Sequence, residues 1–208
     1  MNNRSYLLYD LYRYFYPNDQ VVRISLWQKV RLVLLTQAIW ATIVYRAGSW
    51  CIRNRKSLGA LVRVLLPLLT VCQKLTEIAT GIELPFTARI GRGLYIGHFG
   101  QIIVSGNAVL GEFCNISQGV TIGQAGRGGE QHTPVIGDRV YIAPGAKLFG
   151  KITIGNDVAI GANAVVSKDL PDNAVAVGIP AKVINHDSSR DFVNFNAARM
   201  GLSDKDVS

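Results

Sequence analysis

The sequence predicts a left-handed parallel β-helix that follows an α-helical N-terminal region. Aliphatic residues recur every six positions in the second part of the 208-residue chain, and every three or four positions within residues 23–80. The chain is 49% hydrophobic and 17% charged and contains 21 glycines, a composition typical of a compact body with many turns. We therefore divide it into an α-helical region (1–80), the β-helix (81–185) and a C-terminal tail (186–208).

The helical region is both apolar and basic. Residues 1–80 contain 11 of the 22 lysines and arginines but only 3 of the 14 aspartates and glutamates, so this region carries the whole net charge of +8. The basic residues stand singly among apolar ones, and five of the eight tyrosines fall in the first twenty residues. This pattern favours helices that contact a membrane surface or a protein, and we expect no nucleic-acid partner.

Neither a transmembrane helix nor secretion is expected. The longest uncharged run of the helical region, residues 32–45, is shorter than the ~20 residues that span a bilayer, and Arg63 interrupts the next apolar run. No signal peptide is evident. Cys51, Cys72 and Cys114 have the spacing of neither a disulfide framework nor a metal site. We therefore expect a cytoplasmic protein without a metal, which can lie at the inner face of the membrane.

The six-residue repeat runs from residue 90 to residue 166. Its members are Ile90, Ile96, Ile102, Val104, Leu110, Ile116, Ile122, Ile136, Ile142, Leu148, Ile154, Ile160 and Val166. Each unit of six forms one side of a triangular coil, so residues eighteen apart, such as Ile136 and Ile154, stack inside the prism. A two-residue slip between Ile102 and Val104 and a loop at residues 124–135 interrupt the repeat, and interruptions of this kind are common sites of function.

Five segments carry a resemblance to a known family. They are residues 45–50 (YRAGSW), 82–98 (IELPFTARIGRGLYIGH), 128–132 (GGEQH), 141–150 (YIAPGAKLFG) and 165–184 (VVSKDLPDNAVAVGIPAKVI). Together they resemble the serine O-acetyltransferase-like branch of the hexapeptide acyltransferases. The resemblance implies acetyl-CoA as the acetyl donor and a homotrimer whose active sites are shared between neighbouring prisms.

Acetyl transfer to an alcohol needs a base, and histidine is the side chain best suited to that role near neutral pH. The resemblance implies that His98 is the base, that Glu83 orients it fifteen residues earlier in the chain, and that His132 helps to hold the acceptor or the thioester. For Glu83 the alternative is a solvated charge at a strand end, and for His132 it is a residue on the loop surface.

The resemblance also implies residues that bind acetyl-CoA. Pro144 and Ala162 are eighteen residues apart, so they lie on the same face, where small side chains leave room for the pantetheine arm. Ser167, Lys168 and Lys182 are the candidates for contact with the phosphates of the nucleotide. Each lysine by itself would be a solvated charge.

Two departures from the family pattern bear on the acceptor. Serine-specific members usually carry Asp before the first histidine and Arg before the second, where this chain has Gly97 and Gln131. The sequence is closer to the capsule and exopolysaccharide (colanic-acid-type) O-acetyltransferases, so we expect a sugar hydroxyl of a polysaccharide precursor as acceptor. A serine O-acetyltransferase of cysteine biosynthesis and a non-catalytic β-helix scaffold are the alternatives.

Overall fold

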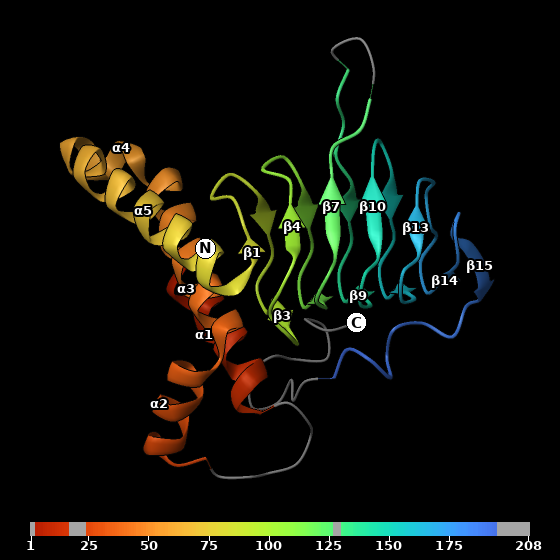
Figure 1. Cartoon of the computed structure of the whole chain (residues 1–208), viewed down its shortest axis with the longest axis horizontal. Helices are drawn as coiled ribbons and strands as arrows, with labels where there is room; N and C mark the ends of the chain where they lie inside the picture. The colour runs from red at the N-terminus through yellow and green to blue at the C-terminus, as the bar shows by residue number, and fades with distance from the viewer. Residues whose placement is uncertain (1–2, 17–23, 127–129, 195–208) are drawn as a thin grey trace.

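A computed structural model describes residues 3–16, 24–126 and 130–194, in which a group of helices stands at one end of a β-helix (Figure 1). The helices are α1 (Asn3–Phe15), α2 (Leu26–Leu35), α3 (Gln37–Arg53), α4 (Arg55–Leu58), the 3₁₀ helix η1 (Gly59–Leu61) and α5 (Val62–Thr80). The strands are β1 (Ile82–Glu83), β2 (Arg89–Ile90), β3 (Tyr95–Ile96), β4 (Ile102–Val104), β5 (Val109–Leu110), β6 (Asn115–Ile116), β7 (Thr121–Gly123), β8 (Val135–Ile136), β9 (Tyr141–Ile142), β10 (Lys147–Phe149), β11 (Thr153–Ile154), β12 (Ala159–Ile160), β13 (Val165–Val166), β14 (Val175–Val177) and β15 (Lys182–Asn185).

The strands form three sheets, which are the three sides of a prism. Sheet A contains β1, β4, β7, β10 and β13, sheet B contains β2, β5, β8 and β11, and sheet C contains β3, β6, β9, β12, β14 and β15. Up to β13, consecutive strands fall in sheets A, B and C in turn, so the chain winds around the prism. The coil-to-coil pairs are parallel, and β15 then turns back to pair antiparallel with β14. The predicted parallel β-helix preceded by helices is confirmed.

The interior of the prism contains the predicted aliphatic series, and every member of it is buried. Ile136 stacks on Ile154 at the expected spacing of eighteen residues. The first coil is longer, since Ile82 pairs with Ile102 twenty residues later. The loop at residues 124–135 lengthens another coil, so that Leu110 pairs with Ile136. The additional residues leave the prism at its corners, and the stacking inside is therefore undisturbed.

The start of α2 and the end of α5 have characteristic caps. Ser25 is the N-cap of α2 and forms a reciprocal capping box. Its hydroxyl accepts from the Gln28 N–H at 3.3 Å, and the Gln28 side chain accepts from the Ser25 N–H at 2.8 Å. Gly81 ends α5 in the left-handed conformation (φ +66°), which glycine adopts without a steric penalty. The next residue begins β1, so α5 leads directly into sheet A.

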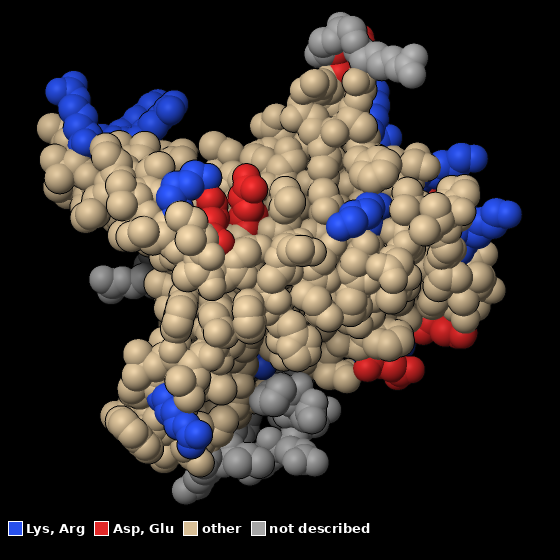
Figure 2. Space-filling view, in the orientation of Figure 1, with Lys and Arg blue, Asp and Glu red and all other residues tan. Residues whose placement is uncertain are grey.

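One helical segment is long and apolar enough to cross a membrane by length and composition. It comprises α4, η1 and α5 (Arg55–Thr80, 26 residues), and none of its most apolar window is buried. The pair α2 and α3 passes the same test together but is bent by 86°. The segment is longer than the uncharged runs of the sequence because the helix continues through Arg63. Figure 2 shows basic side chains at the free end of this segment and a largely uncharged surface below them.

The first part of the C-terminal tail folds back over sheet C. The Asn115 side chain donates to the Phe192 carbonyl at 2.8 Å, and the Phe192 ring stacks on Tyr141 with centroids 4.7 Å apart. The Ser189 hydroxyl donates to the Arg139 carbonyl at 2.5 Å. Residues 195–208 lie outside the described part of the chain. The tail therefore covers much of the outer face of sheet C.

Candidate active site

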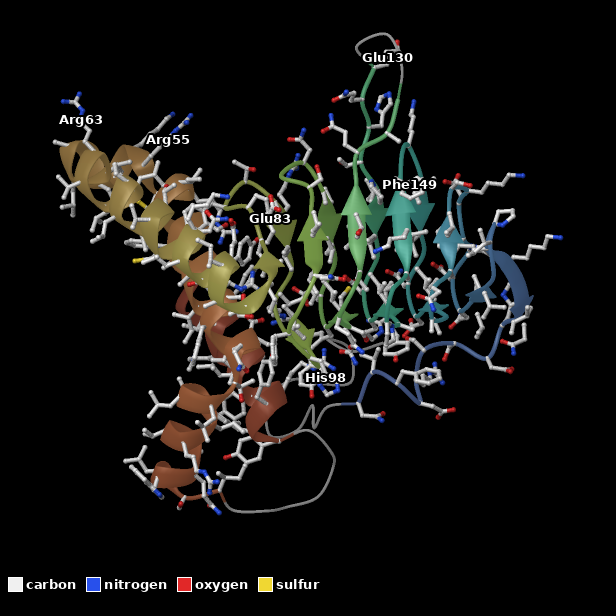
Figure 3. The ribbon with its side chains drawn as sticks, in the orientation of Figure 1. Arg55, Arg63, Glu83, His98, Glu130 and Phe149 are labelled. Atoms are coloured by element: carbon white, nitrogen blue, oxygen red, sulfur yellow. The ribbon has the colours of Figure 1, made fainter. Side chains whose placement is uncertain are left out.

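His98 lies in the turn that joins sheet C to sheet A in the first coil. It follows β3 by two residues, and its side chain is exposed (Figure 3). The two residues that lengthen this coil fall in the same turn, where Gly100 and Gln101 have positive φ values of 106° and 52°. Within the described residues no hydrogen bond to the His98 imidazole occurs. The turn therefore presents His98 outward from the prism, where a substrate can reach it.

The strand that precedes His98 is held by α1. The Tyr14 hydroxyl donates to the Ile96 carbonyl at 3.1 Å and accepts from the Ile96 N–H at 3.0 Å. The Tyr14 ring also packs against Tyr95, with centroids 4.8 Å apart. Burial raises the pKa of Tyr14, so the hydroxyl keeps its proton and remains a donor. Helix α1 thus sets the position of β3 and of the turn that carries His98.

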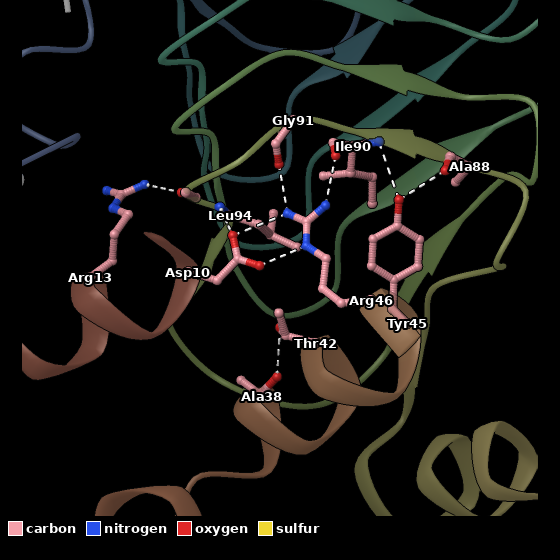
Figure 4. Close-up of polar contacts among 11 residues, drawn as sticks. Asp10, Arg13, Ala38, Thr42, Tyr45, Arg46, Ala88, Ile90, Gly91 and Leu94 are labelled. Carbon is pink, nitrogen blue, oxygen red and sulfur yellow. Dashed lines mark hydrogen bonds and ion pairs between the residues drawn. The ribbon is translucent and has the colours of Figure 1, made fainter. Parts of the chain in front are cut away.

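Buried side chains of α1 and α3 continue this support along the first coil (Figure 4). Arg46 donates to both oxygens of Asp10 at 2.7 and 3.0 Å, and to the carbonyls of Ile90 and Gly91 at 2.7 and 2.6 Å. Asp10 also accepts from the Leu94 N–H at 2.8 Å. The first coil has no preceding coil to pair with, so these side chains satisfy backbone groups that another strand would otherwise bind.

Tyr45 and Arg13 also bond backbone groups of the first coil, and together these side chains cap the β-helix. The Tyr45 hydroxyl donates to the Ala88 carbonyl at 2.8 Å and accepts from the Ile90 N–H at 3.2 Å. Arg13 donates to the Gly93 carbonyl at 2.9 Å. The motif at residues 45–50 therefore contributes to the capping of the β-helix through its first two residues.

His98 shares its corner of the prism with the predicted pantetheine site. The strand residues before this corner are aligned coil by coil, and they are Ile96, Ile116, Ile142 and Ile160. Two positions after each of them come His98, Gln118, Pro144 and Ala162, which form a column along the corner. At about 4.8 Å for each of three coil steps, the column from His98 to Ala162 is about 14 Å long. A thioester at His98 would thus have its arm directed along Pro144 and Ala162.

Gln118 is a further member of this column, and no sequence motif indicated it. Its Oε1 atom is buried and accepts no hydrogen bond from the described residues. A buried acceptor without a donor is costly, so this oxygen is a candidate to accept from a ligand or from a second copy of the chain. Its place two residues after Ile116 in the six-residue repeat is the signal that could have identified it.

His132 lies at the opposite end of the strands of sheet A, in an arm that leaves the corner between sheets A and B (Figure 1). Backbone hydrogen bonds of 3.0 Å in both directions pair Ala125 with His132 at the base of the arm. The Gln124 side chain donates to the Gln131 side-chain oxygen at 2.7 Å, and Glu130 lies at the described tip (Figure 3). One chain therefore does not bring His132 to His98.

The three predicted phosphate contacts divide between the same two corners. Ser167 and Lys168 directly follow β13 and are exposed at the corner between sheets A and B. Lys182 lies opposite Val177 in the pairing of β15 with β14, close to the corner that carries the His98 column. All three side chains are exposed at the end of the β-helix remote from the helices.

Glu83 lies on the outer face of sheet A, opposite Ile103 on the neighbouring strand. Figure 3 shows it well separated from His98, and no hydrogen bond or ion pair joins the two side chains. Glu83 is near Lys74 of α5, whose pKa is raised by its hydrogen bond with Glu77 and, to a smaller extent, by the charge of Glu83. The pairing of Glu83 with His98 stays a prediction, because the two side chains do not contact each other within one chain.

No group of three or more metal-binding side chains occurs in the described residues. Cys51, Cys72 and Cys114 are free thiols.

The comparison with family models matches residues 133–168 to the bacterial transferase hexapeptide (six repeats). A serine acetyltransferase of Helicobacter pylori strain J99 is 36% identical over 159 residues, which are 76% of this chain and 88% of that protein. A serine acetyltransferase of Synechococcus elongatus is 32% identical over 173 residues, and the chain spans 66% of its length.

Solved structures agree with these relatives. The serine acetyltransferase of Neisseria gonorrhoeae in complex with serine superposes with a TM-score of 0.70 at 28% identity, covering 88% of this chain and 69% of that one. A serine acetyltransferase in complex with CoA has a TM-score of 0.66 at 26% identity, covering 86% and 67%.

These names contradict the expectation of a sugar acceptor. That expectation depended on two positions, Gly97 and Gln131, whereas the similarity to proteins named for serine extends over most of the chain. A missing charged partner at two positions does not identify the acceptor, because other groups in the cleft can bind the same ligand.

Proposed function

Because the chain belongs to the hexapeptide-repeat acyltransferases and is an acyltransferase that uses acetyl-CoA, we propose that it is a serine O-acetyltransferase, which transfers the acetyl group to the hydroxyl of L-serine. The observation that carries this proposal is the 36% identity to a serine acetyltransferase over 88% of that protein's length. As in the family, the coils of the β-helix are left-handed.

In the proposed reaction His98 removes the proton from the serine hydroxyl as its oxygen attacks the thioester carbonyl. A carbon–oxygen bond forms, the carbon–sulfur bond breaks, and the imidazolium returns its proton to the departing CoA sulfur. The exposed turn leaves the imidazole accessible to serine, and the column through Pro144 and Ala162 gives the pantetheine arm a path along the same corner. Residues of α1 hold β3, and this fixes where the base stands.

We further propose that the active site is completed between copies of the chain in a homotrimer. The predicted residues lie at opposite ends of the strands of sheet A, with His98 at the corner where these strands begin and His132 at the corner where they end. Much of sheet C is covered by the tail, whereas the outer row of sheet A stays exposed or half-buried. A cleft between the His98 corner of one copy and the His132 corner of the next would contain both histidines and all three predicted phosphate contacts.

The first experiment measures release of the CoA thiol from acetyl-CoA by the purified chain with L-serine as acceptor. O-acetylserine is identified by mass spectrometry, and D-serine and His98→Ala are the controls. We expect release that depends on L-serine and is lost with His98→Ala. Release that does not exceed hydrolysis without an acceptor, from a folded trimer, would contradict the serine assignment.

The second experiment tests the shared cleft by mixing two inactive variants. His98→Ala and His132→Ala are unfolded together and refolded in equal amounts. In randomly mixed trimers about a quarter of the clefts combine an intact His98 corner with an intact His132 corner, so about a quarter of the wild-type activity should return. Activity no greater than the sum of the two separate variants would show that each site belongs to one chain.

A further inference from the structure

Helix α5 and the turn before it carry an apolar stripe that nothing in the described chain covers. Its members are Leu61, Val64, Leu68, Val71, Leu75 and Ile78, which are between 52% and 83% exposed. They recur at intervals of three and four residues, so they share one face of the helix. The side of α5 that packs on α3 is a different one, formed by residues such as Leu65, Leu69 and Cys72, which are half-buried.

A second apolar surface lies on α2. Leu26, Trp27, Leu34 and Leu35 are between 60% and 78% exposed. Both helices stand at the end of the molecule opposite β15 (Figure 1). Large exposed apolar patches mark sites where a protein or a membrane binds, and tryptophan is enriched where a protein meets the headgroup level of a bilayer.

The charges around the stripe are almost all positive. Arg53, Arg55, Lys56 and Arg63 are exposed at the free end of the segment formed by α3, α4 and α5, where Figure 3 labels two of them. Figure 2 shows this end in blue. Of the acidic residues described in the helices, Asp10 is buried against Arg46, and Glu77 is paired with Lys74 at 2.5 Å.

This charge decides between the two kinds of occupant that an apolar helix face can accept. A second copy of the same surface would bring like charges together, whereas a bilayer with anionic headgroups is complementary to them. We propose that the apolar stripe of α5 docks on an anionic bilayer. The apolar stripe enters the boundary between headgroups and acyl chains, and the arginines and lysines at its end contact the lipid phosphates.

The helix lies in the plane of the interface rather than across the bilayer, although it is long enough to span one. Arg63, Thr70, Lys74 and Glu77 fall on one side of α5, again at intervals of three, four or seven residues. A spanning helix would place this polar side in hydrocarbon, where charged groups are costly, whereas an interfacial helix keeps it in water.

The test is co-sedimentation of the full chain with vesicles of phosphatidylcholine that contain about 30% phosphatidylglycerol. We expect binding at about 50 mM salt that weakens at about 300 mM, and little binding to vesicles of phosphatidylcholine alone. Leu68→Ser combined with Leu75→Ser should lower the partition coefficient about tenfold or more. The matched control, Val183→Ser with Ile184→Ser, changes two exposed residues at the other end of the molecule and should bind as the wild type does.

A second pair of variants tests the charge. Arg55→Gln, Lys56→Gln and Arg63→Gln together should lower binding about a hundredfold, since each basic residue near the surface contributes about fivefold. The control carries the same change at Arg89, Lys151 and Arg190 of the β-helix and tail, which are also exposed.

Three results would overturn the proposal. The first is no vesicle binding by the folded wild type at low salt. The second is equal binding by the α4 and α5 variants and their controls. The third is that Leu68→Ser with Leu75→Ser abolishes self-association on analytical ultracentrifugation but leaves vesicle binding unchanged. The last result would assign the stripe to a second copy of the chain. Acetyl-CoA turnover in solution should be unchanged in the α4 and α5 variants, so the test is independent of the proposed reaction.

Discussion

Replacement of Arg46 by Met should strongly destabilise the fold, because Arg46 joins the helical region to the first coil. Its guanidinium is buried with only 2% of the side chain exposed, and it supplies two bonds to Asp10 and one each to the carbonyls of Ile90 and Gly91. Methionine fills a similar volume but donates no hydrogen bond. The buried Asp10 carboxylate then keeps only hydrogen bonds from the backbone of the first coil, such as the bond from the Leu94 N–H.

The magnitude follows from what the substitution leaves behind. Removal of one partner of a buried ion pair costs about 3–5 kcal/mol, because the remaining charge is uncompensated. A protein of this kind has a total stability of about 5–15 kcal/mol, so the loss is a large fraction of it. For a chain of this length the melting temperature should fall by about 6–20 °C.

The loss should also depend on pH. Burial raises the pKa of the Asp10 carboxyl, and Arg46 opposes that rise. Without Arg46 the folded-state pKa moves further above the unfolded value, so the variant loses stability as pH rises above the unfolded value of 3.8. The difference in unfolding free energy between variant and wild type should therefore be smaller near pH 4 than near pH 8.

The assay is urea unfolding followed by circular dichroism at both pH values, with Arg63→Met as the matched control. Arg63 is exposed on α5, so the same chemical change there should alter the unfolding free energy by about 0.5 kcal/mol or less. If Arg46→Met lost less than about 1 kcal/mol at pH 8, the capping role that we assign to this ion pair would be refuted.

Three further predictions concern the active site and the thiols. His98→Ala should lower turnover about 10²–10⁴-fold and leave CoA binding intact by calorimetry, because only proton removal is lost; more than half of the wild-type turnover would exclude His98 as the base. Gly97→Asp should lower KM for serine about tenfold or more through a charge-assisted bond to the ammonium group; a Cβ there would meet Tyr95 no closer than 3.7 Å, so an unchanged KM would place the ammonium elsewhere. Iodoacetamide at pH 8 should modify half-buried Cys72 before Cys114, whose pKa is raised to about 12 by burial, and peptide mass spectrometry showing the reverse order would contradict the buried environment of Cys114.

The six-residue period is a local property, and this is why so much of the β-helix could be predicted from it. The period states which residue of each unit points inward and which residues stack, and the observed pairing of Ile136 with Ile154 follows directly from it. It also places Pro144 and Ala162 in one column. The candidate site residues and the use of acetyl-CoA were predicted from motifs. The predicted acyltransferase class agrees with the names of the relatives. The acceptor was predicted wrongly, since the absence of two charges is weak evidence about a cleft formed by many groups.

The tertiary structure decided what depends on residues far apart in the chain. Asp10 and Leu94 are 84 positions apart, and no local pattern indicates that a helix near the N-terminus supplies the hydrogen bonds missing from the first coil. The same is true of the division of the site. Sequence motifs identify His98 and His132 as candidates but do not say which corner of the prism each one occupies. That corner depends on how many additional residues each turn between strands contains. Local spacing thus determines the prism and its stacking, whereas contacts across the folded chain determine which edges remain open for substrate, a second copy or a membrane.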